Sequence, residues 1–224
     1  RLHIYKVWSW HGTPRGQERQ RISWEDPAAL SVAPFMAAYG RALRALRLPE
    51  AVAIAHADCC ARAELLARIE TALRGGLRML VLREGGLVPA QFAQLARQMG
   101  DLGRRYGATV LVEGGKAQAV HSAAGGVHLC SCRISGLTAP PALTWSASCR
   151  NAGQLTRAAA HGAAFALVPA TEPETVAAAD WQAFEALIRR SAVLVFASGD
   201  IAPADLDAAL RAGAHGVALP LSAW

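Results

Sequence analysis

From Pro49 onward the chain alternates short apolar runs with segments of helical pattern, and it does so eight times. Unbroken apolar runs are typical of parallel strands, because helices cover both faces of such a sheet. Repeated strand–helix units indicate an α/β fold, either a (β/α)8 TIM barrel or an open doubly wound sheet. The short runs GVHL and HGVAL favour the barrel. The expected strands are residues 51–57, 77–84, 108–115, 126–130, 143–148, 163–170, 192–200 and 215–221.

The segments between these runs carry helix start and stop signals. Pro89 predicts a helix start, Asn151 predicts an N-cap, and Gly75 with Gly76 predicts a helix end. We expect a loop over residues 131–142, which contain glycine and two prolines. The expected helices are residues 61–76, 89–107, 116–124, 151–162, 180–190 and 202–213.

Residues 1–50 differ in character from the rest, and we expect a domain boundary between residues 50 and 51. The segment LHIYKVWSW alternates apolar and polar residues, which predicts a strand. A further short strand should precede a helix start at Asp26-Pro27. The segment FMAAYGRALRAL has the pattern of an amphipathic helix, and Pro49 closes a linker after it.

The amino-acid composition favours a globular protein over a membrane protein or a nucleic-acid-binding protein. Hydrophobic residues make up 53% and charged residues 18% of the chain, which suits a large buried core. No uninterrupted apolar stretch is long enough to span a bilayer, and the N-terminus lacks signal-peptide features, so we expect a cytoplasmic protein with no membrane partner. The net charge of +6 comes from arginines spread over many helices, which argues against a specific nucleic-acid surface.

The five cysteines also carry information. An odd count argues against a disulfide framework, so reduced thiols are expected. His128, Cys130, Cys132 and Cys149 fall near the ends of two expected strands, and their types suit a soft metal. The alternative, which we prefer, is that these are small buried residues and that no metal is bound.

Several strand-end segments resemble the thiamine-phosphate synthase and TenI family of barrels. The resemblance covers nearly all of residues 51–224. It implies a TIM barrel and an enzyme of thiamine biosynthesis that joins a pyrimidine diphosphate to a thiazole phosphate with Mg²⁺. The segments that carry it are GLRMLVLREGGL, YGATVLVEGG, AAGGVHLCSCRI, TWSASCRNAGQL, HGAAFALV and ASGDIAPADLDAALRAGAHGVAL.

Residues 1–50 resemble the C-terminal part of a MutT-type Nudix hydrolase, a family that includes 8-oxo-dGTP diphosphatases. The segments VWSWHGTPRGQERQRISWEDPAAL and FMAAYGRALRALRLP carry this resemblance. Together the two resemblances imply a fusion of a Nudix domain with a TenI-like barrel. The Nudix box, which binds the metal, is absent, and Arg1 is not an initiator Met. We therefore expect a missing N-terminal Nudix half as a partner of this segment.

The resemblance implies losses at the diphosphate and metal positions. The family pattern Gln-Leu-Arg-Glu-Lys becomes residues 81–85, VLREG, so Arg83 is retained and the lysine is replaced by Gly85. The metal-binding Asn-Asp falls on Glu113 and Gly114, and a second metal-binding aspartate falls on Arg133. Because Mg²⁺ requires oxygen ligands, we expect no metal unless synthase activity is retained.

The phosphate end departs from the family pattern as well. The family's Gly-Gly-Ile becomes residues 199–201, GDI, and Pro220 removes a backbone donor. Ser148 is retained, whereas Arg150 replaces the histidine of the tautomerase branch. Arg83 and Ser148 are therefore the expected catalytic residues. The expected phosphate-binding residues are Arg83, Arg133, Arg150, Ser198 and Gly199.

Three functions remain open. The barrel could be degenerate and bind a phosphorylated small molecule, it could be an active synthase that uses Arg83 and Ser148, or it could be a structural or dimerising module for the Nudix domain. By position, His56, Asp58 and Cys59 after the first strand are further candidates for catalysis, although a solvated loop is the preferred interpretation there.

Overall fold

A computed structural model describes residues 7, 9–27, 29–32, 39–83, 85–114, 125–171 and 179–224 of the chain. The chain divides into two compact units, residues 1–48 and residues 49–224.

The N-terminal unit contains one helix among its described residues, α1 (Gly40–Arg47). The Trp10 and Trp24 rings are stacked, with centroids 5.4 Å apart. Most of the strand expected over residues 2–10 lies outside the described residues, and residues 9 and 10 are not in a strand. The helix start expected at Asp26-Pro27 is wrong: the Ala29 N–H donates to the Asp26 carbonyl at 3.0 Å and closes a turn. Aspartate followed by proline favours the first positions of a β-turn as well as a helix start.

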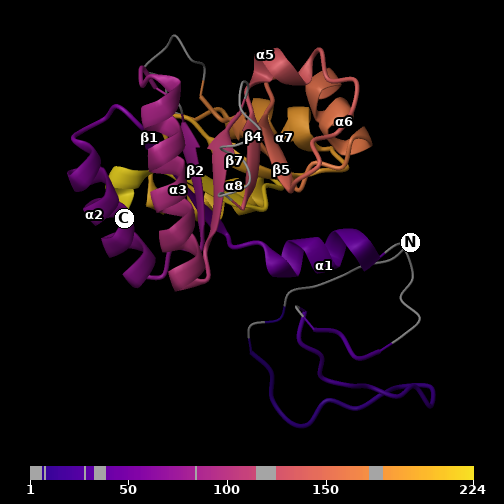
Figure 1. The fold of residues 1–224 in the computed structure, drawn as a ribbon. Coiled ribbons are helices and arrows are strands. Elements are labelled where there is room, and N and C mark those ends of the chain that lie inside the picture. The colour runs from indigo at the N-terminus through magenta and orange to yellow at the C-terminus, as the bar shows by residue number, and fades with distance from the viewer. Residues whose placement is uncertain are drawn as a thin grey trace. The chain divides into compact units, whose positions relative to one another are not determined.

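Residues 49–224 form a closed barrel of eight parallel strands in the order β1 to β8 (Figure 1). The last strand pairs with the first, Ala51 opposite Val217, which confirms the TIM barrel and excludes the open doubly wound sheet. The strands are β1 (Ala51–His56), β2 (Met79–Arg83), β3 (Thr109–Glu113), β4 (Gly126–Leu129), β5 (Trp145–Ser148), β6 (Phe165–Pro169), β7 (Leu194–Ser198) and β8 (Gly216–Pro220).

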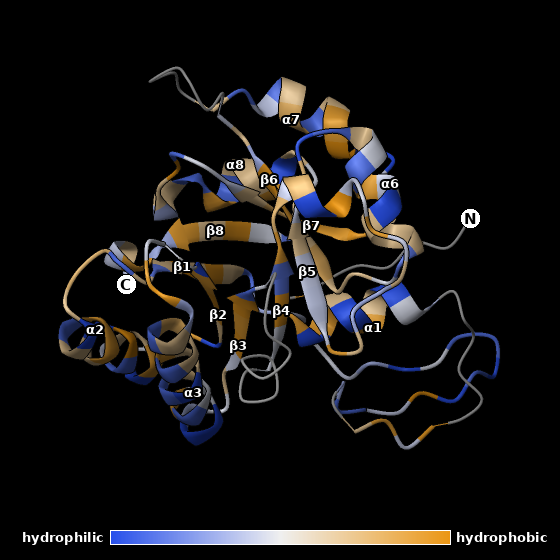
Figure 2. Ribbon diagram, turned by 45° about the horizontal axis from the view of Figure 1, so that its top comes forward, coloured by the Kyte–Doolittle hydropathy of each residue, from blue (hydrophilic) through white to orange (hydrophobic). Residues whose placement is uncertain are grey.

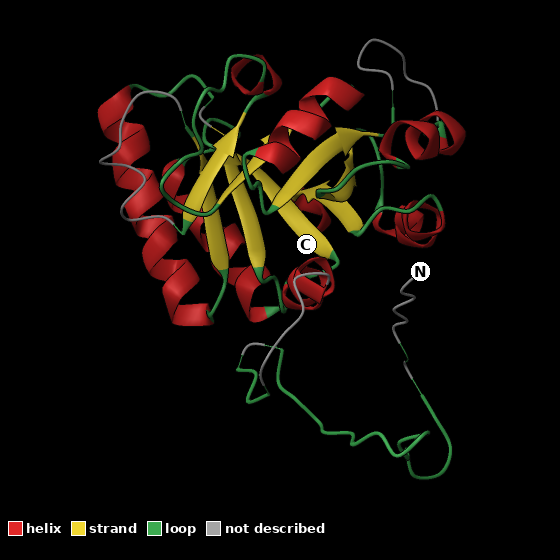
Figure 3. Ribbon diagram, turned by 90° about the vertical axis from the view of Figure 1, so that its right-hand side faces the viewer, coloured by secondary structure: helices red, strands yellow, loops and turns green. Residues whose placement is uncertain are grey.

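Helices lie outside this ring of strands (Figure 3). The Asn151 cap is confirmed, since its side chain accepts a hydrogen bond from the Gln154 N–H. The loop expected over residues 131–142 begins instead with a short helix, and the helix expected over residues 116–124 lies outside the described residues. The helical elements are α2 (Arg62–Arg74), α3 (Pro89–Tyr106), α5 (Ser131–Ile134), α6 (Ala152–Ala160), α7 (Trp181–Ile188), η2 (Pro203–Asp205), α8 (Leu206–Arg211) and η3 (Leu221–Ala223).

The core lies within the barrel and between strands and helices. The strands are mainly hydrophobic, and helices such as α2 and α3 carry both kinds of residue (Figure 2). Phe165 and Phe196 are fully buried and meet edge to face, with centroids 5.1 Å apart. Among the described residues, no helix has the length and apolar character needed to cross a bilayer. Because all strands are parallel, their C-terminal ends meet at one rim, where such barrels carry their sites.

A candidate anion-binding site at the barrel mouth

A cavity of about 340 Å³ opens at this rim. Four of the five predicted phosphate-binding residues line it: Arg83, Arg150, Ser198 and Gly199. Ser148, the second predicted catalytic residue, lines it too. Among the described residues, no Asp or Glu lines the cavity, and this suits an anionic ligand.

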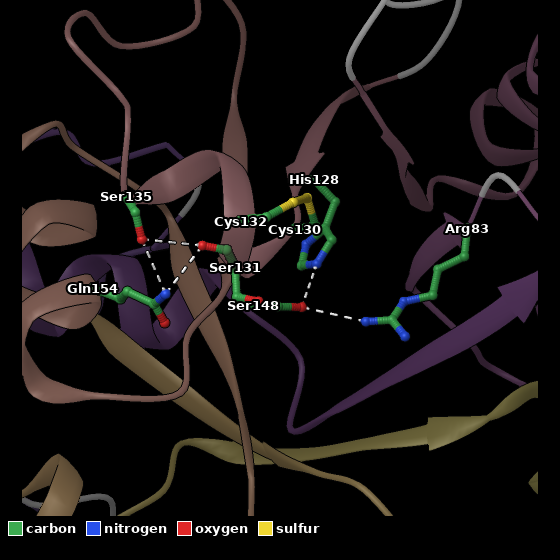
Figure 4. Close-up of a disulfide and its surroundings, with 8 residues drawn as sticks. All are labelled: Arg83, His128, Cys130, Ser131, Cys132, Ser135, Ser148 and Gln154. Carbon is green, nitrogen blue, oxygen red and sulfur yellow. Dashed lines mark hydrogen bonds between the residues drawn. A yellow bond between two sulfur atoms is a disulfide. The ribbon is translucent and has the colours of Figure 1, made fainter. Parts of the chain in front are cut away.

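A chain of hydrogen bonds runs from the cavity wall into the barrel (Figure 4). Arg83 Nη2 donates to Ser148 Oγ at 3.3 Å. Ser148 Oγ lies 2.9 Å from His128 Nε2, and His128 Nδ1 lies 2.8 Å from Ser146 Oγ. These side chains come from three strands, β2, β4 and β5, so the chain fixes the relative positions of those strand ends.

His128 is the buried centre of this chain. Its pKa is lowered to about 3, mainly because burial disfavours the charged ring and secondly because the Arg83 guanidinium is near. A neutral imidazole has one donor and one acceptor nitrogen. Its two serine partners satisfy both nitrogens, so His128 can orient Ser148 Oγ without carrying charge.

One nitrogen of the Arg83 guanidinium makes no hydrogen bond to the described residues. Its Nε is buried and has no hydrogen-bond partner in the described part of the chain. A buried donor without a partner is costly, and such groups are uncommon in folded proteins. Since Arg83 also lines the cavity, its guanidinium suits an oxyanion bound there.

The turn after β7 forms another wall of the cavity. Gly199 has a φ of +107°, and a Cβ added there would lie 2.4 Å from Thr171 Oγ1. The same hydroxyl accepts a hydrogen bond of 3.2 Å from the Asp200 N–H. The turn therefore needs glycine both for its backbone conformation and for the close approach of Thr171.

The three arginines predicted at the mouth do not all meet there. Arg83 and Arg150 line the cavity, whereas Arg133 is exposed on α5 and is not part of the lining. The Arg150 N–H donates to Gln154 Oε1 at 2.7 Å, which holds the backbone at the start of α6. The phosphate-binding role of Arg133 stays a prediction from the sequence.

The family's lysine position is closed in this chain. Gly85 has a φ of +58°, and a Cβ there would lie 2.4 Å from Asp58 Oδ1. Asp58 Oδ2 accepts a hydrogen bond from the Gly86 N–H at 3.1 Å. Asp58 therefore occupies the space that a longer side chain at position 85 would need. Glu84 lies outside the described residues.

The metal positions remain poor in ligands. Glu113 ends β3, and Arg133, which the sequence resemblance aligns with a metal-binding aspartate, is exposed on α5. No group of three or more His, Cys, Asp or Glu side chains suited to a metal occurs among the described residues.

The expectation of reduced thiols is wrong for two of the five cysteines: Cys130 and Cys132 form a disulfide. The chain leaves β4 after Leu129 and turns into α5, which brings the two Cα atoms to 5.5 Å, within the usual disulfide range. The bridge occupies both sulfur atoms, which removes them from the suggested metal cluster. Cys149 is buried, and burial raises the pKa of its thiol to about 12.

Two features of the site were not predicted. Thr171 lines the cavity and supports the Gly199 turn, and nothing in its local sequence distinguishes it. His56 also lines the cavity as the last residue of β1, whereas a solvated loop was the preferred interpretation. Asp58 and Cys59 do lie in the exposed turn after β1.

Comparisons with known proteins agree with this architecture. The family described as Thiamine monophosphate synthase matches residues 51–222. A Geobacter sulfurreducens protein provisionally named thiamine-phosphate synthase is 34% identical over 165 residues, which cover 70% of this chain and 78% of that protein.

Solved structures support the fold alone, since their sequence identities are low. Thiamine phosphate pyrophosphorylase from Pyrococcus furiosus has a TM-score of 0.61 and 18% identity over 76% of this chain and 85% of its own. The (S)-3-O-geranylgeranylglyceryl phosphate synthase from Thermoplasma acidophilum has a TM-score of 0.55 and 10% identity over 84% of this chain and 91% of its own. The family match over residues 51–222 and the relative with 34% sequence identity show that this chain belongs to the thiamine monophosphate synthase (TenI) family.

Proposed function

We propose that the barrel binds a phosphorylated small molecule of the thiamine-phosphate class at its mouth, without a metal ion. The observation that carries the proposal is Arg83, which lines the cavity and whose buried Nε has no hydrogen-bond partner among the described residues. Arg150, which also lines the cavity, would supply a further contact for a phosphate.

Independence from Mg²⁺ follows from the residues that replace the family's ligands. Gly114 and Arg133 cannot supply carboxylate oxygens, and Glu113 would act alone. Two arginines at the cavity can neutralise a phosphate dianion without a cation between them. The two charges of the ligand would then be balanced by protein groups.

Isothermal titration of the purified chain tests this proposal. The titrants are thiazole phosphate, thiamine phosphate and inorganic diphosphate, each with Mg²⁺ and with EDTA. We expect thiamine phosphate to bind with a Kd of about 1–100 μM, unchanged by EDTA. Binding that requires Mg²⁺ would contradict metal independence. Absence of binding by all three would leave the barrel a structural or dimerising module.

An active synthase is the second candidate. Family membership and the Arg83–Ser148 hydrogen bond at the cavity favour it. Such an enzyme would need Mg²⁺ to stabilise the departing diphosphate, as charge develops on its oxygens. Formation of thiamine phosphate from both substrates with Mg²⁺, and its loss in Arg83→Ala, would support this function over simple binding.

We also propose that residues 1–48 belong to a Nudix-type domain of a larger protein. Support comes from the sequence resemblance and from the separate compact unit that these residues form. Trp24 is 76% exposed, although it stacks on Trp10, as expected for a surface that other residues would cover. The test is 8-oxo-dGTP hydrolysis by the natural protein, tagged at its C-terminus and purified from its own cells. A preparation that leaves 8-oxo-dGTP intact would overturn this part.

A further inference from the structure

The Cys130–Cys132 bridge lies directly beyond β4, where the chain enters the rim that holds the cavity. A bridge over one intervening residue restricts the unfolded chain much less than a bridge over a long loop, so it contributes little to stability. Its cysteines are also accessible, since Cys132 is exposed and Cys130 is half-buried. A disulfide that closes a very short loop and is accessible to solvent is better suited to thiol exchange than to stabilising the fold.

The other cysteines do not share this combination. Cys149 is buried, and its raised thiol pKa makes it a poor nucleophile. Cys59 and Cys60 are unpaired, although their sulfur atoms lie 3.7 Å apart. Cys130 and Cys132 are therefore the two cysteines of the five that form a disulfide.

The Gln154 side chain contacts both the turn between the two cysteines and the backbone of Arg150. Gln154 Nε2 donates to the carbonyl of Ser131, the residue between the two cysteines, at 3.0 Å (Figure 4). The other end of the same amide, Gln154 Oε1, accepts the Arg150 N–H at 2.7 Å. Arg150 lines the cavity. The conformation of the bridged turn is thus joined to the position of Arg150 through two hydrogen bonds.

We propose that Cys130 and Cys132 are a reversible dithiol–disulfide site, and that its reduction loosens Arg150 through Gln154. The reductant is an external dithiol. Its thiolate attacks Cys132 Sγ, the Cys130–Cys132 bond breaks, and Cys130 leaves as a thiolate. The second thiolate of the dithiol then attacks the mixed disulfide and releases Cys132. The external dithiol loses two electrons and becomes a disulfide, while the protein gains two electrons and, after protonation, two thiols.

The first test measures the chemistry without a ligand. A Cys59→Ser/Cys60→Ser variant keeps three cysteines, one of which, Cys149, is outside the bridge. It is equilibrated in buffers of reduced and oxidised dithiothreitol, quenched in acid and labelled with a maleimide under denaturing conditions. We expect one labelled cysteine in oxidising buffer and three in reducing buffer, with a reversible change between them. One labelled cysteine in every buffer, or three in every buffer, would overturn the proposal.

The second test measures the coupling, also without a ligand. Amide hydrogen exchange at Arg150 is compared in the oxidised and reduced forms of the same variant. Loss of one hydrogen bond should raise the exchange rate several-fold, up to about tenfold. Gln154→Glu is the matched control, because it keeps the acceptor for Arg150 and removes the donor to Ser131. Arg150 should then stay protected, and its redox dependence should disappear. Equal exchange rates at Arg150 in the oxidised and reduced forms of the Cys59→Ser/Cys60→Ser protein, which is the parent here, would overturn the coupling.

The effect on affinity rests on the proposed function. Reduction should weaken binding of thiamine phosphate several-fold in the parent and leave it unchanged in Gln154→Glu. Equal affinity in both redox forms of the parent would overturn this effect. If no ligand binds in either form, the proposed function fails, whereas thiol labelling and amide exchange still decide the redox site.

Discussion

Arg83 and Ser148 are 65 residues apart in the sequence, yet Arg83 Nη2 donates to Ser148 Oγ at 3.3 Å. They stand on β2 and β5, strands that are not neighbours in the barrel, so the long arginine side chain reaches across its mouth. Arg83 Nε has no hydrogen-bond partner in the part of the chain that the structure describes. One arginine therefore ties two strands together and still offers a donor to a ligand.

Replacing Arg83 should weaken binding of thiamine phosphate. We expect Arg83→Lys to raise the Kd about tenfold, because lysine keeps the charge but cannot offer the same pair of donors, and Arg83→Ala to raise it about a hundredfold. Titration calorimetry measures both. Arg133→Ala is the matched control, since Arg133 is outside the cavity lining. Equal losses in Arg83→Ala and Arg133→Ala would restore the role that the sequence suggested for Arg133.

Gly199→Ala should destabilise the turn after β7. Gly76 has almost the same φ, +106°, but an added Cβ there meets nothing within 4 Å. Gly76→Ala thus measures the backbone cost alone, roughly 1–3 kcal/mol. We expect Gly199→Ala to lose about 1–3 kcal/mol more in urea unfolding, because the Cβ meets Thr171. If the two variants lose the same stability, the close contact does not matter.

His128 should make the stability of the barrel depend on pH. The unfolded ring takes up a proton below about pH 6.5, whereas the folded ring stays neutral to about pH 3. The unfolded state therefore binds more protons between these values, and acid removes stability at about 1.4 kcal/mol per pH unit. Relative to His128→Gln, the parent should lose roughly 2 kcal/mol between pH 6.5 and 4.5. Parallel pH profiles of the two proteins would show that His128 takes up its proton at the same pH in the folded and the unfolded chain.

Restoring the family's lysine should fail in this chain. Gly85→Lys places a side chain against Asp58, so we expect a loss of about 1–3 kcal/mol in stability and no gain in diphosphate affinity. Adding Asp58→Gly should recover part of the stability, measured by thermal unfolding. Gly76→Lys, at an open position, controls for lysine in a strained backbone conformation. A Gly85→Lys protein as stable as the parent would show that Asp58 moves aside freely.

The sequence predicted the barrel because each strand is an unbroken apolar run flanked by helix signals. The run at 77–84 and the observed β2 (Met79–Arg83) differ only at the ends, where periodicity gives no information. The site was harder to predict because its contacts join distant segments. The sequence marked Arg83 and Ser148 separately, but only the closed barrel brings Arg83 to Ser148 and Ser148 to His128.

The wrong predictions have the same origin. After Cys130 the chain turns into α5, where a loop was expected. That turn also brings Cys130 and Cys132 within bonding distance, which a count of cysteines could not indicate. Asp26-Pro27 satisfies the requirements of both a helix start and a β-turn, so tertiary context decided between them.

The burial of Cys149 makes this residue a natural reporter of barrel opening. Cys149 belongs to the packed core, and in the sequence it lies between Ser148 and Arg150, which both line the cavity. In a protein whose Cys59 and Cys60 are replaced and whose Cys130–Cys132 pair is oxidised, Cys149 is the single remaining thiol. The rate at which a reagent labels that thiol would then record how often the wall between β5 and α6 separates, in the unmodified fold and without a fluorescent label.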